Sequence, residues 1–201
     1  MSAIKTICVF CGSSSGKKDN YLAAAEQLGK VLAAQGIGLV YGGGGIGLMG
    51  AIARAVMEAG GDVTGILPGV LRGKERPEAA SVGQSYGKLI LVETMHERKA
   101  MMAELSDGYI AMPGGFGTLD ELFESITWGQ LGIQRKPIGL LNVDGYYDNL
   151  LAWIERAVAD GFVQPAYRDL LVVDGDPAAL VTKVQSHLPP LGVVKLESWR
   201  A

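Results

Sequence analysis

The sequence predicts an α/β fold, a doubly wound Rossmann-like parallel sheet with helices on both faces. Two observations favour this fold class: short apolar runs alternate with amphipathic helical patterns, and three of the loops that follow such runs are unusually rich in glycine. Apolar runs bounded by turn residues are typical of strands covered on both faces. The predicted strands span residues 4–10, 38–41, 62–67, 88–92, 108–112 and 138–141.

Length and composition favour a single domain. A chain of 201 residues, of which 48% are hydrophobic, can bury a sizeable core. We expect one domain over residues 1–188 and a loosely attached tail over residues 189–201. Residues 69–87 are rich in charge, Gly, Pro and Ser and interrupt the alternation, so they predict a long surface loop or lid.

The charge and the apolar runs exclude several classes of protein. A net charge of −3 gives no electrostatic footprint for nucleic acid or for an anionic membrane. Every apolar run is too short or too glycine-broken to span a bilayer, and the N-terminus lacks the apolar segment of a signal peptide. We therefore expect a cytoplasmic protein that binds neither nucleic acid nor membrane.

The cysteines and histidines predict neither a disulfide nor a metal site. Cys8 and Cys11 have C-x-x-C spacing, but residues three apart on a strand point to opposite faces, so we expect two packed free thiols. The chain has only two histidines, His96 and His187, and no cysteine pair near them. Four zinc ligands therefore cannot be assembled.

The first glycine-rich loop follows the first predicted strand and runs from Cys11 through Gly16. Its small residues, among them Gly12 and Ser13, offer hydroxyls and backbone donors to a ligand. A plain Gly/Ser turn explains the same residues about as well.

The second loop, Gly42-Gly-Gly-Gly-Ile-Gly-Leu-Met-Gly50, matches G-x-G-x-x-G in two registers. The acidic residue that would hold a ribose 2′-hydroxyl should end the next strand, but Leu67 and Pro68 stand there, which disfavours a dinucleotide site. No Gly-Lys-Ser/Thr follows, so the loop is not a Walker A motif either. Four successive glycines are costly to order, and they favour a glycine-lined surface for a nucleotide or phosphate over a purely structural turn.

The third loop, Pro113-Gly-Gly-Phe-Gly-Thr-Leu-Asp-Glu121, joins a glycine turn to the start of a helix. We expect Gly114, Gly115 and Gly117 to adopt positive φ and to let the backbone approach a ligand. The unpaired N–H groups of the first helical turn would then face that ligand. The loop therefore predicts an anion site.

An arginine precedes this loop in an unexpected place. Thr94-Met-His-Glu97 is a capping box and predicts a helix over residues 94–105. Arg98 falls within its apolar stripe of Met95, Met102 and Leu105, where a cation requires an anion. A side chain that reaches solvent, or that pairs with a structural carboxylate, explains it equally well. Lys99 lies at the edge of the stripe.

Glu121 also has two interpretations. Thr118-Leu-Asp-Glu121 is itself a capping box, in which the glutamate only satisfies backbone donors. On the predicted helix, Leu119, Leu122, Phe123, Ile126 and Ile133 mark a buried side. Glu121 instead aligns with Ser125, Trp128, Gly129 and Gly132, and such a face predicts a pocket or a contact with another subunit.

Three segments together are similar to a known family: Pro113-Gly-Gly-Phe-Gly-Thr-x-x-Glu121, Met95-His-Glu-Arg-Lys99 and the loop over residues 42–50. They resemble the Lonely Guy (LOG) family of cytokinin riboside 5′-monophosphate phosphoribohydrolases. The resemblance continues through residues 126–132 and 136–147 and covers roughly residues 5–175. Many relatives carry the label "lysine decarboxylase", but nothing in the sequence suggests pyridoxal phosphate chemistry.

The resemblance implies hydrolysis of the N-glycosidic bond of AMP or of its N6-prenylated forms, without a cofactor. It implies that Arg98 and Glu121 are the catalytic pair, in a homodimer with sites near the interface. A carboxylate near C1′ would stabilise the positive ribosyl ring and orient or deprotonate water, while Arg98 would hold the phosphate or ribose. The expected substrate contacts, from the resemblance and the glycine loops, are Gly12, Ser13, Gly43, Gly44, Gly47, Glu75, Met95, Lys99, Gly114, Gly115, Phe116, Gly117, Thr118, Leu119, Asp120 and Thr127.

Two other functions compete with hydrolysis. A non-catalytic carrier or sensor could use the same glycine loops to bind a nucleotide or a phosphate-bearing cofactor. It would not need both Arg98 and Glu121, so the pair favours the enzyme. An NAD-dependent oxidoreductase is disfavoured by the missing acidic residue.

Overall fold

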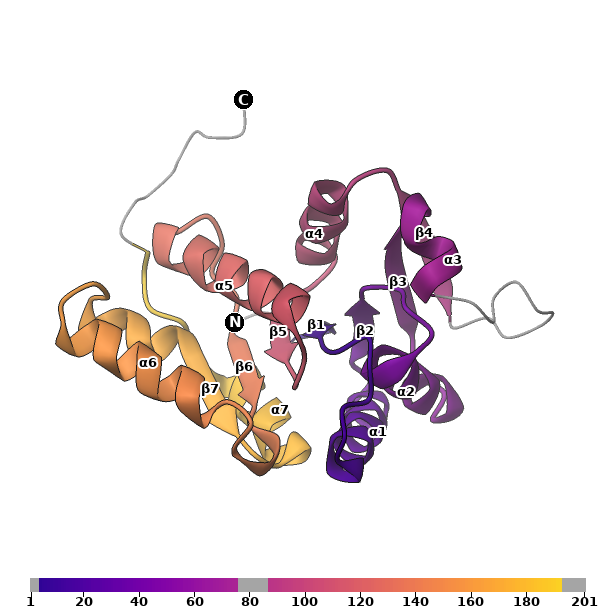
Figure 1. Cartoon of the computed structure of the whole chain (residues 1–201), viewed down its shortest axis with the longest axis horizontal. Helices are drawn as coiled ribbons and strands as arrows, with labels where there is room; N and C mark the ends of the chain where they lie inside the picture. Colours follow the sequence, from indigo (N-terminus) through magenta and orange to yellow (C-terminus); the bar gives the residue numbers. More distant parts are fainter. Residues whose placement is uncertain (1–3, 76–86, 193–201) are drawn as a thin grey trace.

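A parallel sheet lies between two layers of helices (Figure 1). The computed structural model describes residues 4–75 and 87–192. Within them the sheet has seven strands in the order β4-β3-β2-β1-β5-β6-β7, and every neighbouring pair is parallel. The strands are β1 (Thr6–Phe10), β2 (Gly38–Tyr41), β3 (Val63–Pro68), β4 (Lys88–Val92), β5 (Gly108–Ala111), β6 (Ile138–Leu141) and β7 (Leu171–Asp174).

The helices connect successive strands and cover both faces of the sheet (Figure 1). The α-helices are α1 (Asp19–Ala34), α2 (Gly47–Glu58), α3 (Arg72–Glu75), α4 (Met95–Glu104), α5 (Phe116–Leu131), α6 (Asp148–Ala159) and α7 (Pro177–Ser186). Short 3-10 turns are η1 (Gly69–Leu71), η3 (Val143–Gly145) and η4 (Pro165–Leu170).

Successive side chains of β1 point to opposite faces of the sheet and so belong to two separate parts of the core. Ile7 and Val9 pack in a cluster with residues of α1, α2 and α7, whereas Phe10 packs in a second cluster with residues of α4, α5 and α6. Cys11 belongs to the first cluster and Cys8 to the second. Both are buried free thiols, as predicted, because residues three apart on a strand face opposite sides.

The predicted fold class is confirmed, and all six predicted strands exist with ends shifted by at most two residues. The seventh strand, β7, was missed. Its run Leu171-Val-Val-Asp174 is short and follows η4, so the chain around it lacks the alternation that marked the others. The predicted loop over residues 69–87 is wrong in its first part, which forms η1 and α3; residues 76–86 lie outside the described part.

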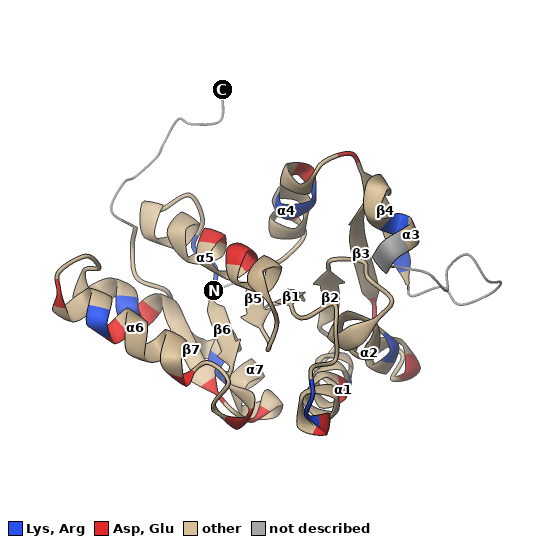
Figure 2. Cartoon of the chain, in the orientation of Figure 1, with Lys and Arg blue, Asp and Glu red and all other residues tan. Residues whose placement is uncertain are grey.

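Charged side chains lie on the helices, on the loops and at the ends of the edge strands β4 and β7, while β1, β2, β5 and β6 carry none (Figure 2). This distribution is expected for central strands covered on both faces. Among the described residues, no helix is long and apolar enough to cross a membrane. Of the predicted tail, Pro189 is buried and its carbonyl accepts a hydrogen bond from Arg135 Nε at 2.9 Å; residues 193–201 lie outside the described part.

The crossing of α1 and α2 gives a test of the packing. Gly29 is buried in α1, and a Cβ there would lie 2.8 Å from Ala55 Cβ and 2.9 Å from the Ile52 carbonyl oxygen of α2. We expect Gly29→Ala to lower the free energy of unfolding by about 1–3 kcal/mol from overpacking, outweighing its gain of about 1 kcal/mol in helix propensity. Urea denaturation measures this, with the exposed Lys30→Ala as the control. An unchanged free energy of unfolding would show that α1 and α2 can move apart to accommodate the methyl group without loss of stability.

Candidate functional site

The glycine-rich loops meet at the carboxyl edge of the sheet, around the point between β1 and β5 where the strand order reverses. A cleft of about 360 Å³ opens there, as expected for a doubly wound sheet. The loops after β1, β2 and β5 and the first turns of α4 and α5 contribute its walls. The predicted site residues that line it are Gly12, Ser13, Met95, Arg98, Gly115, Phe116, Gly117, Thr118, Asp120 and Glu121.

Helix α4 starts where its capping box predicted. Thr94 Oγ1 accepts from the Glu97 amide at 3.1 Å, and Glu97 Oε2 accepts from the Glu93 amide at 2.8 Å. The apolar stripe is only partly as predicted: Met102 is buried with Arg98, but Met95 and Leu105 are 43% and 41% exposed. Met95 instead lines the open cleft.

Arg98 is buried, with 6% of its surface exposed. Its Nη2 donates to the Gly42 carbonyl at 3.0 Å, and its Nη1 lies 3.8 Å from Met95 Sδ as a weak donor contact. Within the described part of the chain, its Nε is a buried donor without a hydrogen-bond partner. The acceptors at Gly42 and Met95 are neutral and one donor of this buried cation is unused, so the site suits an anion in the cleft.

Glu121 does not cap its helix. α5 begins at Phe116 and its N-cap is Gly115, which has extended backbone angles, so Thr118 is already the third helical residue. The predicted capping box at Thr118 is therefore wrong, because the glycine turn lets the helix start earlier. Glu121 lies one turn inside the helix, with its side chain on the cleft.

The charges of Glu121 and Arg98 both affect the pKa values of the two buried cysteine thiols. Burial raises the pKa of Cys11 most, the Glu121 carboxylate raises it further, and the Arg98 guanidinium opposes the rise. Burial and Glu121 likewise raise the pKa of Cys8. Both thiols therefore stay protonated and are poor nucleophiles.

The glycine turn acts differently from the prediction. Gly114, Gly115 and Gly117 are not among the glycines with positive φ, so that expectation is wrong. A Cβ at Gly114 would overlap Thr118 Oγ1 and lie 2.9 Å from the Gly12 amide nitrogen, whereas a Cβ at Gly115 or Gly117 would meet no atom within 4 Å. Glycine at 114 is thus required by packing, and at 115 and 117 it leaves the cleft open beside the first amides of α5.

Packing also explains the glycines of the second loop. Gly43 has φ +77°, and a Cβ there would lie 3.0 Å from Leu67 Cβ. Side chains at Gly44 and Gly47 would meet Met49 and the backbone of Ser13. None of these three predicted contacts is among the cleft-lining residues. The sequence analysis missed Gly42, which lines the cleft, and a Cβ there would overlap the Arg98 guanidinium.

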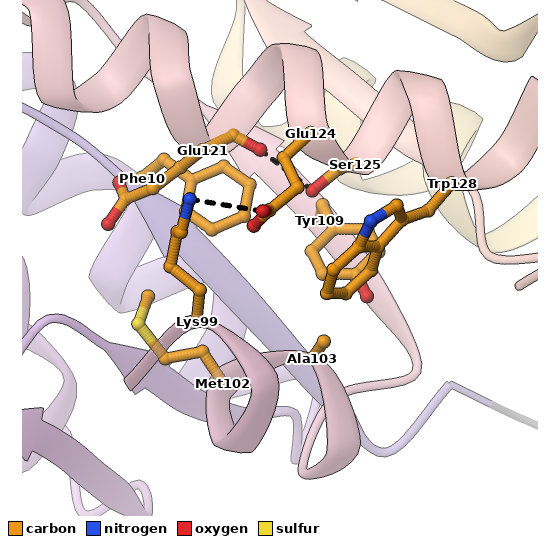
Figure 3. Close-up of a pocket in the computed structure, with 9 residues that line it drawn as sticks. All are labelled: Phe10, Lys99, Met102, Ala103, Tyr109, Glu121, Glu124, Ser125 and Trp128. Atoms are coloured by element: carbon orange, nitrogen blue, oxygen red, sulfur yellow. Dashed lines mark hydrogen bonds and ion pairs between the residues drawn. The ribbon is translucent and has the colours of Figure 1, made fainter. Parts of the chain in front are cut away.

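Lys99 joins α4 to α5 by ion pairs. Its Nζ lies 3.0 Å from Glu124 Oε1 and 3.2 Å from Asp120 Oδ2, and Figure 3 shows it extending from α4 toward Glu124. Burial opposes its charge, but the hydrogen bonds to Glu124 and Asp120 outweigh burial and raise the pKa of Lys99. This predicted substrate contact therefore holds the two helices together and is not among the residues that line the cleft.

Part of the second face of α5, which was predicted to meet a pocket or another subunit, packs against the chain itself. Glu121, Ser125 and Trp128 line a cavity of about 10 Å³ against α4 and β5 (Figure 3), which is about the volume for one water molecule. The predicted buried side is shifted: the buried residues of α5 are Thr118, Leu122, Ser125 and Gly129.

Three further predicted contacts lie away from the cleft or have side chains outside the described part of the structure. Leu119 is half-buried and packs against the core. Thr127 is exposed, and its hydroxyl donates to the Phe123 carbonyl at 2.7 Å. Glu75 ends α3, and its side chain lies outside the described part of the structure.

Comparisons with known proteins show the family to which the chain belongs. A family model described as "Possible lysine decarboxylase" matches residues 49–184. The probable cytokinin riboside 5′-monophosphate phosphoribohydrolase LOGL9 of Oryza sativa subsp. japonica is 53% identical over 94% of this chain and 81% of its own length. The cytokinin riboside 5′-monophosphate phosphoribohydrolase LOG5 of Arabidopsis thaliana is 51% identical over 98% of this chain and 85% of its own. The chain belongs to the LOG family.

Solved structures extend the likeness of this LOG family member to more distant proteins. The molybdenum cofactor carrier protein of Chlamydomonas reinhardtii superposes with a TM-score of 0.66 over 90% of this chain and 96% of its own, at 23% identity. The molybdenum cofactor binding protein of Rippkaea orientalis gives a TM-score of 0.66 over 92% and 98%, also at 23% identity. At this identity the likeness shows the shared fold alone.

A pair of substitutions separates the two uses of glycine in the turn. We expect Gly114→Ala to lower the melting temperature by several degrees, since its methyl group overlaps Thr118. Gly117→Ala meets no protein atom and should keep the wild-type melting temperature while it weakens AMP binding, because the methyl group enters the cleft. Thermal unfolding and calorimetric titration measure both. Equal melting temperatures for the two variants would contradict the packing role of Gly114.

Proposed function

We propose that this chain is a phosphoribohydrolase that cleaves the N-glycosidic bond of cytokinin riboside 5′-monophosphates, of AMP, or of both. The observation that carries the proposal is the buried Arg98, with a donor unused, lining the same cleft as Glu121. The names of the relatives at about half identity support the same activity. Water would add across the bond between C1′ and the base, giving the free base and ribose 5-phosphate.

The glycine turn and Arg98 bind the nucleotide in this proposal. The first N–H groups of α5, at Phe116, Gly117 and Thr118, precede the intrahelical hydrogen bonds and suit the 5′-phosphate. Arg98 offers a planar donor group from the opposite wall and binds the phosphate or ribose. Both contacts form in the ground state and persist in the transition state, so they contribute to affinity as well as rate.

Glu121 carries the chemistry. Cleavage of a nucleoside bond builds positive charge on the ribosyl ring, which a nearby carboxylate stabilises. The same carboxylate orients or deprotonates the water that attacks C1′. A carrier needs no such group, and likeness to molybdenum cofactor carriers rests on the fold alone, so the Arg98–Glu121 pair favours the enzyme over a binding protein.

We further propose a homodimer with its sites near the subunit boundary. Phe116 is 94% exposed and Met95 is 43% exposed, and both line the cleft. Large apolar side chains beside a ligand site are typical of a surface that another chain covers. A second subunit there would shield the cleft from water and strengthen its electrostatic interactions.

Replacement of Glu121 tests the catalytic role. We expect Glu121→Gln to keep the fold and AMP affinity while the release of free base falls by roughly two to four orders of magnitude, since the amide carries no negative charge. Chromatography of reactions with AMP and with isopentenyladenosine monophosphate measures the product. Exposed Glu104→Gln, on α4, is the matched control. Turnover in the Glu121 variant comparable to wild type would exclude the role.

Replacement of Arg98 tests the binding role. Arg98→Ala should lower both AMP affinity and turnover, because its contact is made before and during the reaction. Arg98→Lys keeps the charge but cannot reproduce the planar fork, so it should recover only part of the affinity. Calorimetric titration with AMP in the Glu121→Gln background, in which hydrolysis is suppressed, reports binding without turnover. Wild-type affinity in the alanine variant would contradict the assignment.

A further inference from the structure

Three successive carbonyl groups, from the residue before the glycine turn to its first glycine, accept hydrogen bonds. The Met112 oxygen accepts from Tyr147 Oη at 2.5 Å, the Pro113 oxygen from the Gly12 amide at 3.1 Å, and the Gly114 oxygen from Tyr146 Oη at 2.5 Å. Tyr146 and Tyr147 come from the loop between β6 and α6, which contributes no residue to the cleft lining. Two adjacent tyrosines therefore hold the backbone on both sides of Pro113.

The orientation of these carbonyls fixes the orientation of the turn's amides. In a planar trans peptide the C=O and N–H groups point in opposite directions, and the described residues contain no cis peptide bond. When Tyr146 holds the Gly114 carbonyl, the Gly115 N–H must point away from Tyr146. Gly115 lines the cleft, next to the first amides of α5. A rotated peptide would instead turn a carbonyl oxygen toward the anion, which is repulsive.

The loop that carries the tyrosines is itself tightly constrained. Asp144 has φ 54°, a left-handed conformation that is unfavourable for a residue with a side chain, and Gly145 has φ 70°. Asn142 Oδ1 accepts from the Tyr147 amide at 2.7 Å, and Lys18 of the α1 N-cap pairs with Asp144. The Tyr146 ring packs edge-on against Tyr147, with centroids 4.9 Å apart. These contacts hold the Tyr146 side chain so that its hydroxyl lies against the turn.

We propose that Tyr146 is a positioning residue for the 5′-phosphate: through the Gly114 carbonyl it aims the Gly115 amide into the cleft. The proposal rests on the proposed function, in which this turn binds the phosphate. Tyr147 differs in its surroundings, because it is 2% exposed and its acceptor precedes the turn. Tyr146 is 43% exposed, so its hydroxyl can be removed without leaving a cavity in the core.

The test compares ligands with and without a phosphate. In Tyr146→Phe we expect the dissociation constants of AMP and ribose 5-phosphate to rise about fivefold to tenfold, as for a misplaced hydrogen bond, while that of adenosine is unchanged. If the chain turns over AMP, KM should rise with kcat within about twofold, since a uniform binding contact is weakened. Calorimetric titration gives the affinities, and thermal unfolding confirms that the variant folds.

Tyr21→Phe is the matched control. It removes a hydroxyl from a ring that also packs edge-on against Tyr146, at 5.7 Å, and leaves both tyrosine contacts to the turn intact. Wild-type affinities are expected for this variant. Unchanged ribose 5-phosphate affinity in Tyr146→Phe, or equal weakening of AMP and adenosine, would overturn the proposal. Ribose 5-phosphate has no N-glycosidic bond, so its affinity is measured without turnover. Absence of free base from the wild type would therefore count against the proposed function and leave the comparison of ribose 5-phosphate with adenosine decisive.

Discussion

The site depends on one buried cation. Arg98 is placed under the cleft by α4, with the Gly42 carbonyl as its close acceptor and no side chain at Gly42 to displace it. A buried guanidinium is stable only when its donors are satisfied, and part of its hydrogen-bonding capacity remains unused here. In the function that we propose, an anionic ligand supplies the missing acceptor, and the guanidinium already lies at the cleft that would bind this ligand.

The second wall depends on the placement of α5. Because Gly115 is the N-cap, the helix presents its first amides at the cleft and Glu121 one turn later on the same helix. Lys99 links this helix to α4 through ion pairs with Asp120 and Glu124. These ion pairs help to fix the positions of Arg98 and Glu121 relative to each other. An exposed ion pair stabilises little, but Lys99 has only 13% of its side chain exposed and is screened less.

The sequence predicts the fold well because the signals for its strands are local. Apolar runs predicted six of the strands, and the position of an arginine on an apolar stripe indicated the buried cation. The capping pattern at Thr118 gave a wrong start for α5. The helix begins after the preceding Gly115, and the Thr–Glu spacing does not determine where it starts. The roles of Gly43, Gly44 and Gly47 were also misjudged, since a glycine needed for close packing and one that faces a ligand look the same in a sequence.

Contacts between distant segments explain what the sequence could not reveal. Tyr146 lies 32 residues beyond Gly114, and nothing in its local pattern indicates that its hydroxyl bonds that carbonyl. Yet the amides of the turn are useful to an anion only if their carbonyls point elsewhere, which requires donors from another part of the chain. The proposed anion site thus depends on three separate segments: the loop after β1 with Gly12, the turn after β5, and the tyrosine loop after β6. Glycine makes the turn accessible, and the surrounding donors make it electropositive.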